Sequence, residues 1–172
     1  MKRIPKFLWF MILLPLPAVA GEEPVELGVL VSGEVAEVVV KPGQRVAAGE
    51  LLVKMDERLF KARVAEARAR LAAAQAALEQ AGRELERAQE LYERALLSDY
   101  ELKEAEVSHL KARAERAAAA GRLLEAQIEL ERCRLLAPFD GRVARVIAWK
   151  GLQVQNSQRI QPLVELVREA GP

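Results

Sequence analysis

Cysteine and histidine are almost absent from this sequence, which holds one of each in 172 residues. A lone cysteine, Cys133, cannot form a disulfide within the chain, so a small fold built on disulfide bridges is excluded. His109 also stands alone, with no Ser/His/Asp set, no Gly-rich phosphate loop and no metal-ligand spacing around it. We therefore expect a protein without catalytic residues, metal ligands or a cofactor.

An excess of charge of either sign is lacking as well. The sequence has 26 basic and 25 acidic residues, and they are interspersed along the chain. A protein that binds nucleic acid usually gathers Lys and Arg on one face. The sequence therefore indicates no nucleic-acid partner.

Residues 1–20 have the order of a secretory signal peptide. Lys2, Arg3 and Lys6 precede an apolar core, and Ala18-Val19-Ala20 is a small-x-small cleavage site. The alternative is a retained membrane anchor, which needs roughly 20 apolar residues, and prolines shorten this core. We expect export and cleavage. Cleavage would remove three basic residues and no acidic ones, which leaves 23 basic residues against 25 acidic ones.

Two separate segments have the character of β-structure. Residues 25–55 contain short runs rich in Val and Leu, divided by turn signals at Pro42-Gly43 and Ala48-Gly49. Residues 135–167 have the same character. Because so few strands seldom fold alone as an all-β unit, we expect the two segments to form one β-sandwich together.

The residues between these segments predict a long helix, then a turn. The carboxylate of Asp56 can cap the start of the helix. Apolar residues then recur at alternating steps of four and three, which is a strong coiled-coil pattern. This seam consists of Phe60, Val64, Ala67, Leu71, Ala74, Leu78, Ala81, Leu85, Ala88, Tyr92 and Ala95.

The seam stops where the sequence predicts the start of a second helix. Ser98-Asp99-Tyr100-Glu101 has the pattern of a capping box, and Leu97 and Leu102 occupy the positions of a hydrophobic staple. A second helix should therefore begin at about residue 99 and return alongside the first, with the apex of the hairpin at about 96–99.

The second helix carries two apolar stripes, which we interpret as one wide apolar face. One stripe can pair within the hairpin and the other can meet a neighbouring subunit, and the sequence alone leaves open which does which. Cys133 continues the second stripe, which favours a buried structural thiol over an intermolecular disulfide. The first stripe is Val107, Leu110, Ala114, Ala117, Gly121, Leu124 and Ile128, and the second is Leu102, Ala105, Ala112, Ala119, Leu123, Ala126 and Leu130.

The predicted organisation follows from these segments. A signal peptide (1–20) is followed by the first half of the β-domain (21–55), a helical hairpin (56–134), the second half of the β-domain (135–167) and a tail (168–172). The fold class is α+β, with an antiparallel coiled-coil hairpin inserted into a β-sandwich.

The two β segments resemble the half-motifs of a biotinyl/lipoyl-type β-domain. The first half-motif is carried by Gly33, Val35, Gly43, Val46, Gly49, Leu51 and Asp56, and the second opens with Ala137-Pro138-Phe139-Asp140-Gly141. With the hairpin between them, the chain resembles the periplasmic adaptor, or membrane-fusion, family (HlyD type) of tripartite efflux and secretion systems. The resemblance covers almost all of the chain after residue 20.

This resemblance implies a non-catalytic adaptor in the periplasm, associated with the cell envelope. The implied partners are an outer-membrane exit-duct protein (TolC-like) and an inner-membrane transporter of RND or ABC type, with copies of the chain forming a homo-oligomeric tube of hairpins. Adaptors that dock on a duct carry an Arg, a Leu four residues later and a Ser seven after that, which here are Arg87, Leu91 and Ser98. Alternatively, Ser98 only caps a helix, Arg87 is a solvated side chain and Leu91 packs beside the seam.

The sequence departs from the family pattern in two places. The family usually continues into a β-barrel and a membrane-proximal domain, whereas this sequence stops at Pro172, so we expect a minimal adaptor or a partial gene product. The family often has a further glycine after Val154, where this sequence has Asn156-Ser157.

Two other functions compete with the adaptor. A biotinyl or lipoyl carrier would present a lysine at a turn, and Lys54 is the candidate, but it lies within a strand pattern. A structural coiled coil, or an assembly partner of a full-length adaptor, accounts for residues 57–134 but leaves the paired β segments unexplained.

Overall fold

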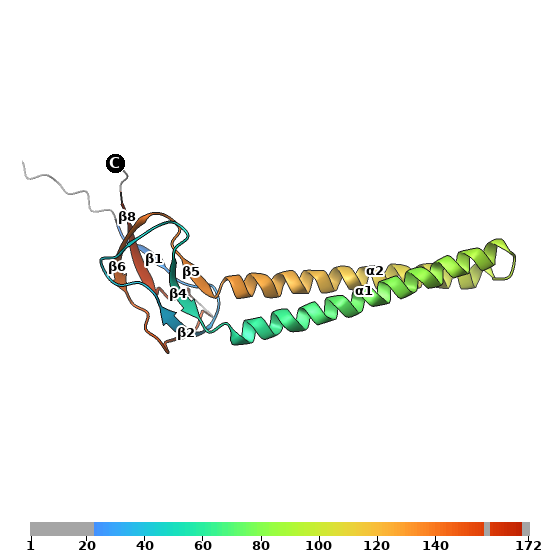
Figure 1. Ribbon diagram of the computed structural model, residues 1–172, viewed down its shortest axis with the longest axis horizontal. Helices are drawn as coiled ribbons and strands as arrows, with labels where there is room; N and C mark the ends of the chain where they lie inside the picture. The colour runs from blue at the N-terminus through green and yellow to red at the C-terminus, as the bar shows by residue number, and fades with distance from the viewer. Residues whose placement is uncertain (1–22, 157–158, 170–172) are drawn as a thin grey trace, which may run out of the picture.

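The computed structural model describes residues 23–156 and 159–169 as two helices and eight strands. The expected signal peptide lies outside these residues. In chain order the elements are β1 (Val25–Leu27), β2 (Gly33–Val38), β3 (Arg45–Val46), β4 (Leu51–Met55), α1 (Arg58–Glu93), α2 (Asp99–Glu131), β5 (Arg134–Leu136), β6 (Gly141–Val146), β7 (Gln153–Val154) and β8 (Val164–Arg168). Figure 1 shows a small β-domain from which the two helices project as one arm.

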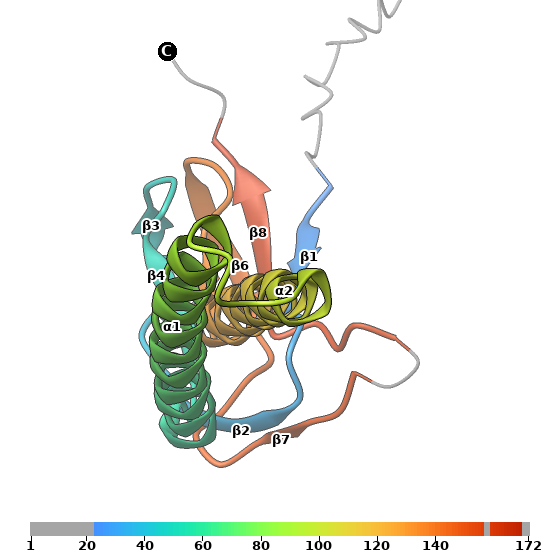
Figure 2. The ribbon, with the colours of Figure 1, turned by 90° about the vertical axis from the view of Figure 1, so that its right-hand side faces the viewer.

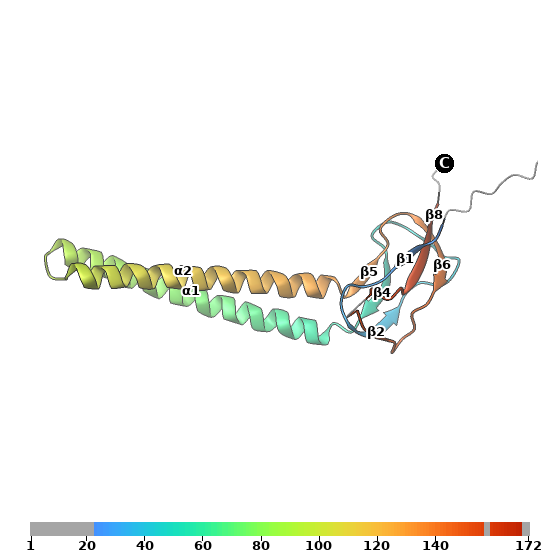
Figure 3. The same cartoon turned by 180° about the vertical axis from the view of Figure 1, so that it is seen from behind.

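Both sheets of the β-domain combine strands from before the hairpin with strands from after it. One antiparallel sheet has the order β5-β4-β2-β7 and lies at the base of the hairpin, and the other has the order β1-β8-β6-β3 and lies farther from it (Figures 1 and 3). The predicted α+β sandwich built from two half-motifs is therefore confirmed. In the described residues, the β2–β4 and β6–β8 pairings lie within one half, and the other four pairings join the two halves.

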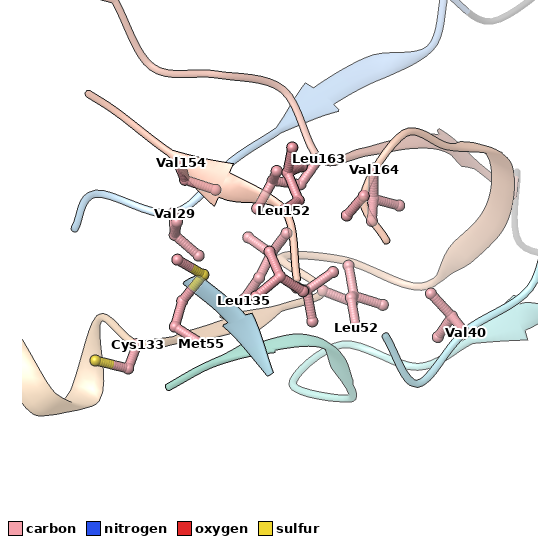
Figure 4. Close-up of a cluster of buried hydrophobic side chains, with 14 of the residues drawn as sticks. Val29, Val40, Leu52, Met55, Cys133, Leu135, Leu152, Val154, Leu163 and Val164 are labelled. Carbon is pink, nitrogen blue, oxygen red and sulfur yellow. The ribbon is translucent and has the colours of Figure 1, made fainter. Parts of the chain in front are cut away.

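The core of the β-domain lies between the two sheets and draws on both halves of the sequence. Leu52 and Met55 come from β4, whereas Leu163, Val164 and Leu166 come from the end of the chain, and all five are fully buried. Figure 4 shows how the side chains it labels gather between the strands. Full burial of each such side chain stabilises the fold by roughly 1.5–3 kcal/mol, so the separated segments hold each other in place.

Asn156, found where the resemblance led us to expect a glycine, has a structural role of its own. Its side-chain amide donates hydrogen bonds to the carbonyl oxygens of Val29 and Val31 at 2.8 and 3.0 Å. Its Oδ1 accepts a hydrogen bond from the backbone N–H of Gln161 at 3.0 Å. The side chain thus satisfies backbone groups of two loops that are far apart in sequence.

The seam predicted for the first helix is confirmed over most of α1. The five buried residues of α1 are every seventh residue, and the leucines between them are half-buried, whereas Tyr92 and Ala95 at the end of the predicted seam are exposed. Alternating small and large residues allow α2 to approach closely. The buried residues are Phe60, Ala67, Ala74, Ala81 and Ala88.

The interpretation of α2 as having one wide apolar face is wrong. The second stripe, including the buried Ala119 and Ala126, packs against α1, and the first stripe is exposed. The two stripes are offset by two residues, which is about 200° around a helix of 3.6 residues per turn. They therefore lie on nearly opposite sides of α2. Cys133 continues the packed stripe and is fully buried, and this burial raises the pKa of its thiol to about 11.

Glu57 is a buried charged residue at the foot of the hairpin, with 5% of its surface exposed. Its Oε1 accepts a hydrogen bond from Arg134 Nε at 2.8 Å, and its Oε2 forms an ion pair with Lys61 Nζ at 2.9 Å, without hydrogen-bond geometry. Arg134 first and Lys61 second lower the pKa of Glu57 from 4.5 to about 2. Because Arg134 opens β5, the ion pair ties the start of α1 to the strand after α2.

The start of α1 differs slightly from the prediction. The helix begins at Arg58 rather than at Asp56. Asp56 nevertheless caps the first turn, because its Oδ1 accepts a hydrogen bond from the Arg58 backbone N–H at 3.0 Å. The side chain of Arg58 folds back onto the same carboxylate, and these bonds lower the pKa of Asp56 to about 2.

Two glycines should respond in opposite directions to alanine substitution. A methyl group on Gly141 would overlap the carbonyl oxygen of Val167 in the neighbouring strand, so Gly141→Ala should lower the free energy of unfolding by about 1–3 kcal/mol. Gly121, within α2, has no atom within 4 Å of an added methyl group, so Gly121→Ala should raise it by up to about 1 kcal/mol. Urea denaturation measures both, and equal losses would contradict the pairing of β6 with β8.

Glu57 should make stability fall in acid. A carboxylate whose pKa is depressed in the folded state stabilises the fold above its unfolded-state pKa of about 4.5, and this contribution is lost as the pH falls towards about 2. Glu57→Gln should therefore lower the free energy of unfolding at pH 7. It should also reduce the loss of stability between about pH 5 and pH 2, and the loss that remains comes in part from Asp56, whose pKa is also lowered.

Thermal unfolding measured across this pH range tests the role of Glu57. The matched control is Glu66→Gln, which removes an exposed i,i+4 ion pair with Arg70 and should leave the profile nearly unchanged. A Glu57→Gln profile parallel to that of the unsubstituted chain would contradict the assignment.

Candidate partner-binding site at the hairpin tip

The far end of the arm is a tight turn that begins with a Schellman motif. Leu96 N–H donates to the carbonyl oxygen of Leu91, and Ala95 N–H donates to that of Tyr92, both at 2.9 Å. Ala95 has a φ of 57° and is the one non-glycine with positive φ in the described part of the chain. These bonds satisfy carbonyl groups that the end of α1 would leave without partners.

The capping box predicted at the start of the second helix is confirmed. Ser98 Oγ accepts a hydrogen bond from the Glu101 backbone N–H at 3.3 Å, and Glu101 Oε2 accepts one from the Ser98 backbone N–H at 2.9 Å. The hydrogen bonds from Ser98 hold the pKa of Glu101 below its ordinary value. Leu97 and Leu102 are half-buried on either side, as a hydrophobic staple requires.

The three residues predicted to contact a partner lie at the tip, but in different settings. Arg87 is exposed on α1, and Leu91 lies one turn farther along, half-buried. Ser98 is across the turn, with its side chain engaged in the capping box. Within the described residues, no hydrogen bond or ion pair joins the three side chains. Their role as a partner-binding set stays a prediction.

Sequence reasoning missed two side chains that the tip exposes most. Leu96 is 69% exposed and Tyr100 is 76% exposed. The exposure of Leu96 could have been predicted, because only one of the two adjacent leucines in the turn, Leu97, acts as the hydrophobic staple and the other is left exposed. Tyr92 is partly exposed nearby, and its hydroxyl interacts with the carboxylate of Asp99, which raises the pKa of Tyr92. The tip therefore combines apolar surface with charged groups.

The residues that a metal site or a carrier lysine would need can be located in the structure. Across residues 23–156 and 159–169, no three His, Cys, Asp or Glu side chains are placed to hold a metal ion. Lys54, the lysine of the carrier alternative, lies inside β4, where it pairs with Glu37 on one side and Arg134 on the other. Lys54 therefore lies within a strand, whereas a carrier domain presents its lysine at an exposed turn.

One family model covers both the β-domain and the hairpin. The description "RND MFP, barrel-sandwich hybrid domain" matches residues 23–166, which is most of the chain. The chain belongs to this membrane-fusion-protein family. The match runs from before β1 into β8, so it includes the hairpin as well as both halves of the β-domain. A comparison with curated proteins gave no match.

Solved structures of the family have the same architecture. A MacA–MexA chimera that contains the Pseudomonas aeruginosa MexA α-hairpin domain is 26% identical, with a TM-score of 0.58 over 85% of this chain and 46% of that one. The membrane fusion protein Spr0693 from Streptococcus pneumoniae R6 (24% identity, TM-score 0.63, 79% and 55% covered) and ZneB from Cupriavidus metallidurans (22%, 0.60, 84% and 60%) share the fold.

This family member spans about 40–60% of the length of the first structures it matches. Neither helix in the described residues is both long and apolar enough to cross a membrane. The family member is a barrel-sandwich domain that carries a helical hairpin.

Removing the capping hydroxyl should loosen the tip. Ser98→Ala deletes the acceptor for the Glu101 N–H and should lower the free energy of unfolding by about 1 kcal/mol. Ser98→Asp keeps an acceptor there and should restore most of that loss. Ser108→Ala, on the exposed part of α2, is the matched control and should be neutral or slightly stabilising. Hydrogen exchange at residues 96–102 measures the effect, and unchanged protection in Ser98→Ala would contradict it.

Proposed function

We propose that this protein is a non-catalytic periplasmic adaptor of a tripartite efflux or secretion pump. In this role the hairpin tip contacts an outer-membrane exit duct of TolC-like type, and the β-domain end faces an inner-membrane transporter of RND or ABC type. The observation that supports this best is the projecting arm (Figure 1), whose tip exposes Leu96 and Tyr100.

The dimensions of the arm support a bridging role. The 36 residues of α1 and the 33 residues of α2 correspond to about 50–55 Å at 1.5 Å per residue. The helices extend together from the β-domain and cross towards the tip in both lateral views (Figures 1 and 3). An arm of this length separates the tip from the β-domain by more than the thickness of a small domain.

The tip residues divide the proposed contact between them. Leu96 and Tyr100 offer apolar surface to the duct. Arg87, exposed on α1 before the turn, can donate directional hydrogen bonds to backbone carbonyl groups or carboxylates of the duct. Leu91, through its carbonyl oxygen, and Ser98, through the capping box, hold the turn in shape. Ser98 thus acts as a positioning residue.

The proposed adaptor works as a homo-oligomer, since one arm cannot enclose a path. Hairpins standing side by side would form a tube through which cargo passes, and no residue of the arm needs to bind the cargo tightly. The proposal includes export to the periplasm by the signal peptide at residues 1–20, which lie outside the described part of the structure.

Photo-crosslinking in intact cells tests the tip contact. A photoreactive amino acid at Leu96 or at Leu91 should form adducts with an outer-membrane duct protein, because both positions lie at the tip. The same probe at Arg70, on the shaft of α1, is the matched control and should form none. Mass spectrometry of the adducts identifies the partner.

Two results would count against the adaptor. Adducts from the tip only with other copies of the chain, or with nothing, would favour a structural coiled coil or an assembly partner of a full-length adaptor. Equal adducts from the tip and from the shaft would mean that the contact is not made by the tip.

A further inference from the structure

A large side chain stands at the foot of the hairpin seam, where the corresponding positions farther along α1 are alanines. Phe60 is the first of the five buried residues of α1, and the other four are alanines at intervals of seven. Alanines let two helices approach closely, whereas a phenylalanine ring holds them apart. Figure 1 shows the two helices separated where they join the β-domain. The foot of the hairpin is therefore more open than its shaft.

A groove with a volume of about 350 Å³ lies at this foot. Three segments line it, which are the connection between β1 and β2, the first turns of α1 and the end of α2. Figure 2, which looks along the arm from the tip, shows this connection passing from β1 to β2 beside the helices. Pockets for small ligands have volumes of about 300–1,000 Å³. The groove is thus large enough for one small molecule.

Apolar side chains form much of the groove surface. Leu30, on the connection, is 54% exposed, and Leu59, on α1, is 60% exposed. Val31 and Phe60 lie deeper in the groove and are buried. An alkyl chain that covered the two leucines would remove their apolar surface from water, which favours binding. The fold itself leaves both leucines uncovered.

The charged groups of the groove leave one positive charge without a partner. Arg63 is neutralised by Glu129, whose Oε2 lies 2.9 Å from its Nη1, and the Arg63 guanidinium also lies over the Phe60 ring, 5.5 Å from the ring centre. Arg132 lines the same groove, is exposed, and forms no ion pair within the described residues. A ligand in the groove therefore meets an available guanidinium group.

Ser32 supplies a neutral hydrogen-bond donor in the same groove. Its Oγ accepts a hydrogen bond from the Asn156 backbone N–H at 3.1 Å, which leaves the hydroxyl hydrogen available for an oxygen atom of a ligand. A guanidinium group and a hydroxyl donor match a carboxylate or sulfate head, which accepts several hydrogen bonds. A cationic head would be repelled by Arg132 and would find Glu129 already paired.

We propose that this groove binds an anionic amphiphile with a single alkyl chain. The anionic head contacts Arg132 and Ser32. The alkyl chain lies along Leu30 and Leu59, over the Phe60 ring. This inference goes beyond the proposed adaptor function, because it concerns a ligand at the foot of the hairpin and not the partner at its tip. A ligand that contacts α1, α2 and the β-domain at once favours the arrangement of these three parts that surrounds it.

Titration calorimetry of the full-length chain with decanoate, kept below its micelle concentration, tests the groove. Decanoate should bind at one site per protein chain. Each CH₂ group removed from the alkyl chain should weaken binding by about two- to fourfold, as expected for burial of a methylene group. Decyltrimethylammonium has the same alkyl chain with a cationic head and should bind at least about tenfold more weakly. Acetate, which has the head without the alkyl chain, should show no binding.

Matched substitutions test the two parts of the site separately. Arg132→Gln should weaken decanoate binding about tenfold. Arg122→Gln removes an exposed arginine of α2 that lies about 15 Å nearer the tip, and it should leave the affinity unchanged. Leu59→Gln should reduce the dependence of affinity on alkyl-chain length, whereas Leu124→Gln, at a leucine of similar exposure on α2, should not. Circular dichroism should show the same helix content in all four variants.

Three results would overturn the proposal. They are equal binding of the anionic and cationic amphiphiles, unchanged decanoate affinity in Arg132→Gln, and no saturable binding of decanoate below its micelle concentration. Binding to phosphatidylglycerol vesicles without binding of monomeric decanoate would overturn it as well, because a membrane surface is a different ligand. The tip experiment is separate, since crosslinks from Leu96 test the adaptor function and decanoate tests the groove.

Discussion

The whole structure depends on backbone hydrogen bonds between strands that the hairpin separates in sequence. β4 ends just before α1, β5 begins just after α2, and the two strands pair directly, with Lys54 opposite Arg134. Strand edges left unpaired would cost free energy, and neither half has enough strands to form a stable sheet by itself. Since the β-domain closes only when both halves are present, the hairpin must leave and return at adjacent points.

Polar interactions with defined direction hold the two ends of the hairpin, and an apolar seam fills the length between them. At the foot, the buried carboxylate of Glu57 lies between Arg134 and Lys61. At the tip, a Schellman motif and a capping box close the turn within a few residues. The seam supplies the apolar contact between the helices, and Arg63–Glu129 and Arg116–Gln75 add polar contacts along its length. The polar groups at the two ends add directional contacts that fix where the hairpin leaves the β-domain and where it turns.

Much of this could be predicted from the sequence where the signal is local. The heptad steps of α1 and the capping box at Ser98 depend on residues close together, and both are confirmed. The burial of Glu57 could not be predicted, because its partner Arg134 lies 77 positions away. Nor could the packed stripe of α2 be chosen, since two stripes of similar composition differ only in what lies opposite them. The assignment of Arg87, Leu91 and Ser98 to a partner remains a prediction for the same reason.

A hairpin needs one apolar seam on each helix. The first stripe of α2, which is exposed, is therefore not explained by packing within the hairpin. Exposed apolar surface of this extent usually marks an interaction site. If neighbouring copies cover it, every tip stands at the same height and points in the same direction. Each tip offers only a small apolar surface, chiefly Leu96 and Tyr100. Several tips held level would bind a symmetric partner far more tightly than one tip, because each contact after the first is made within the same complex.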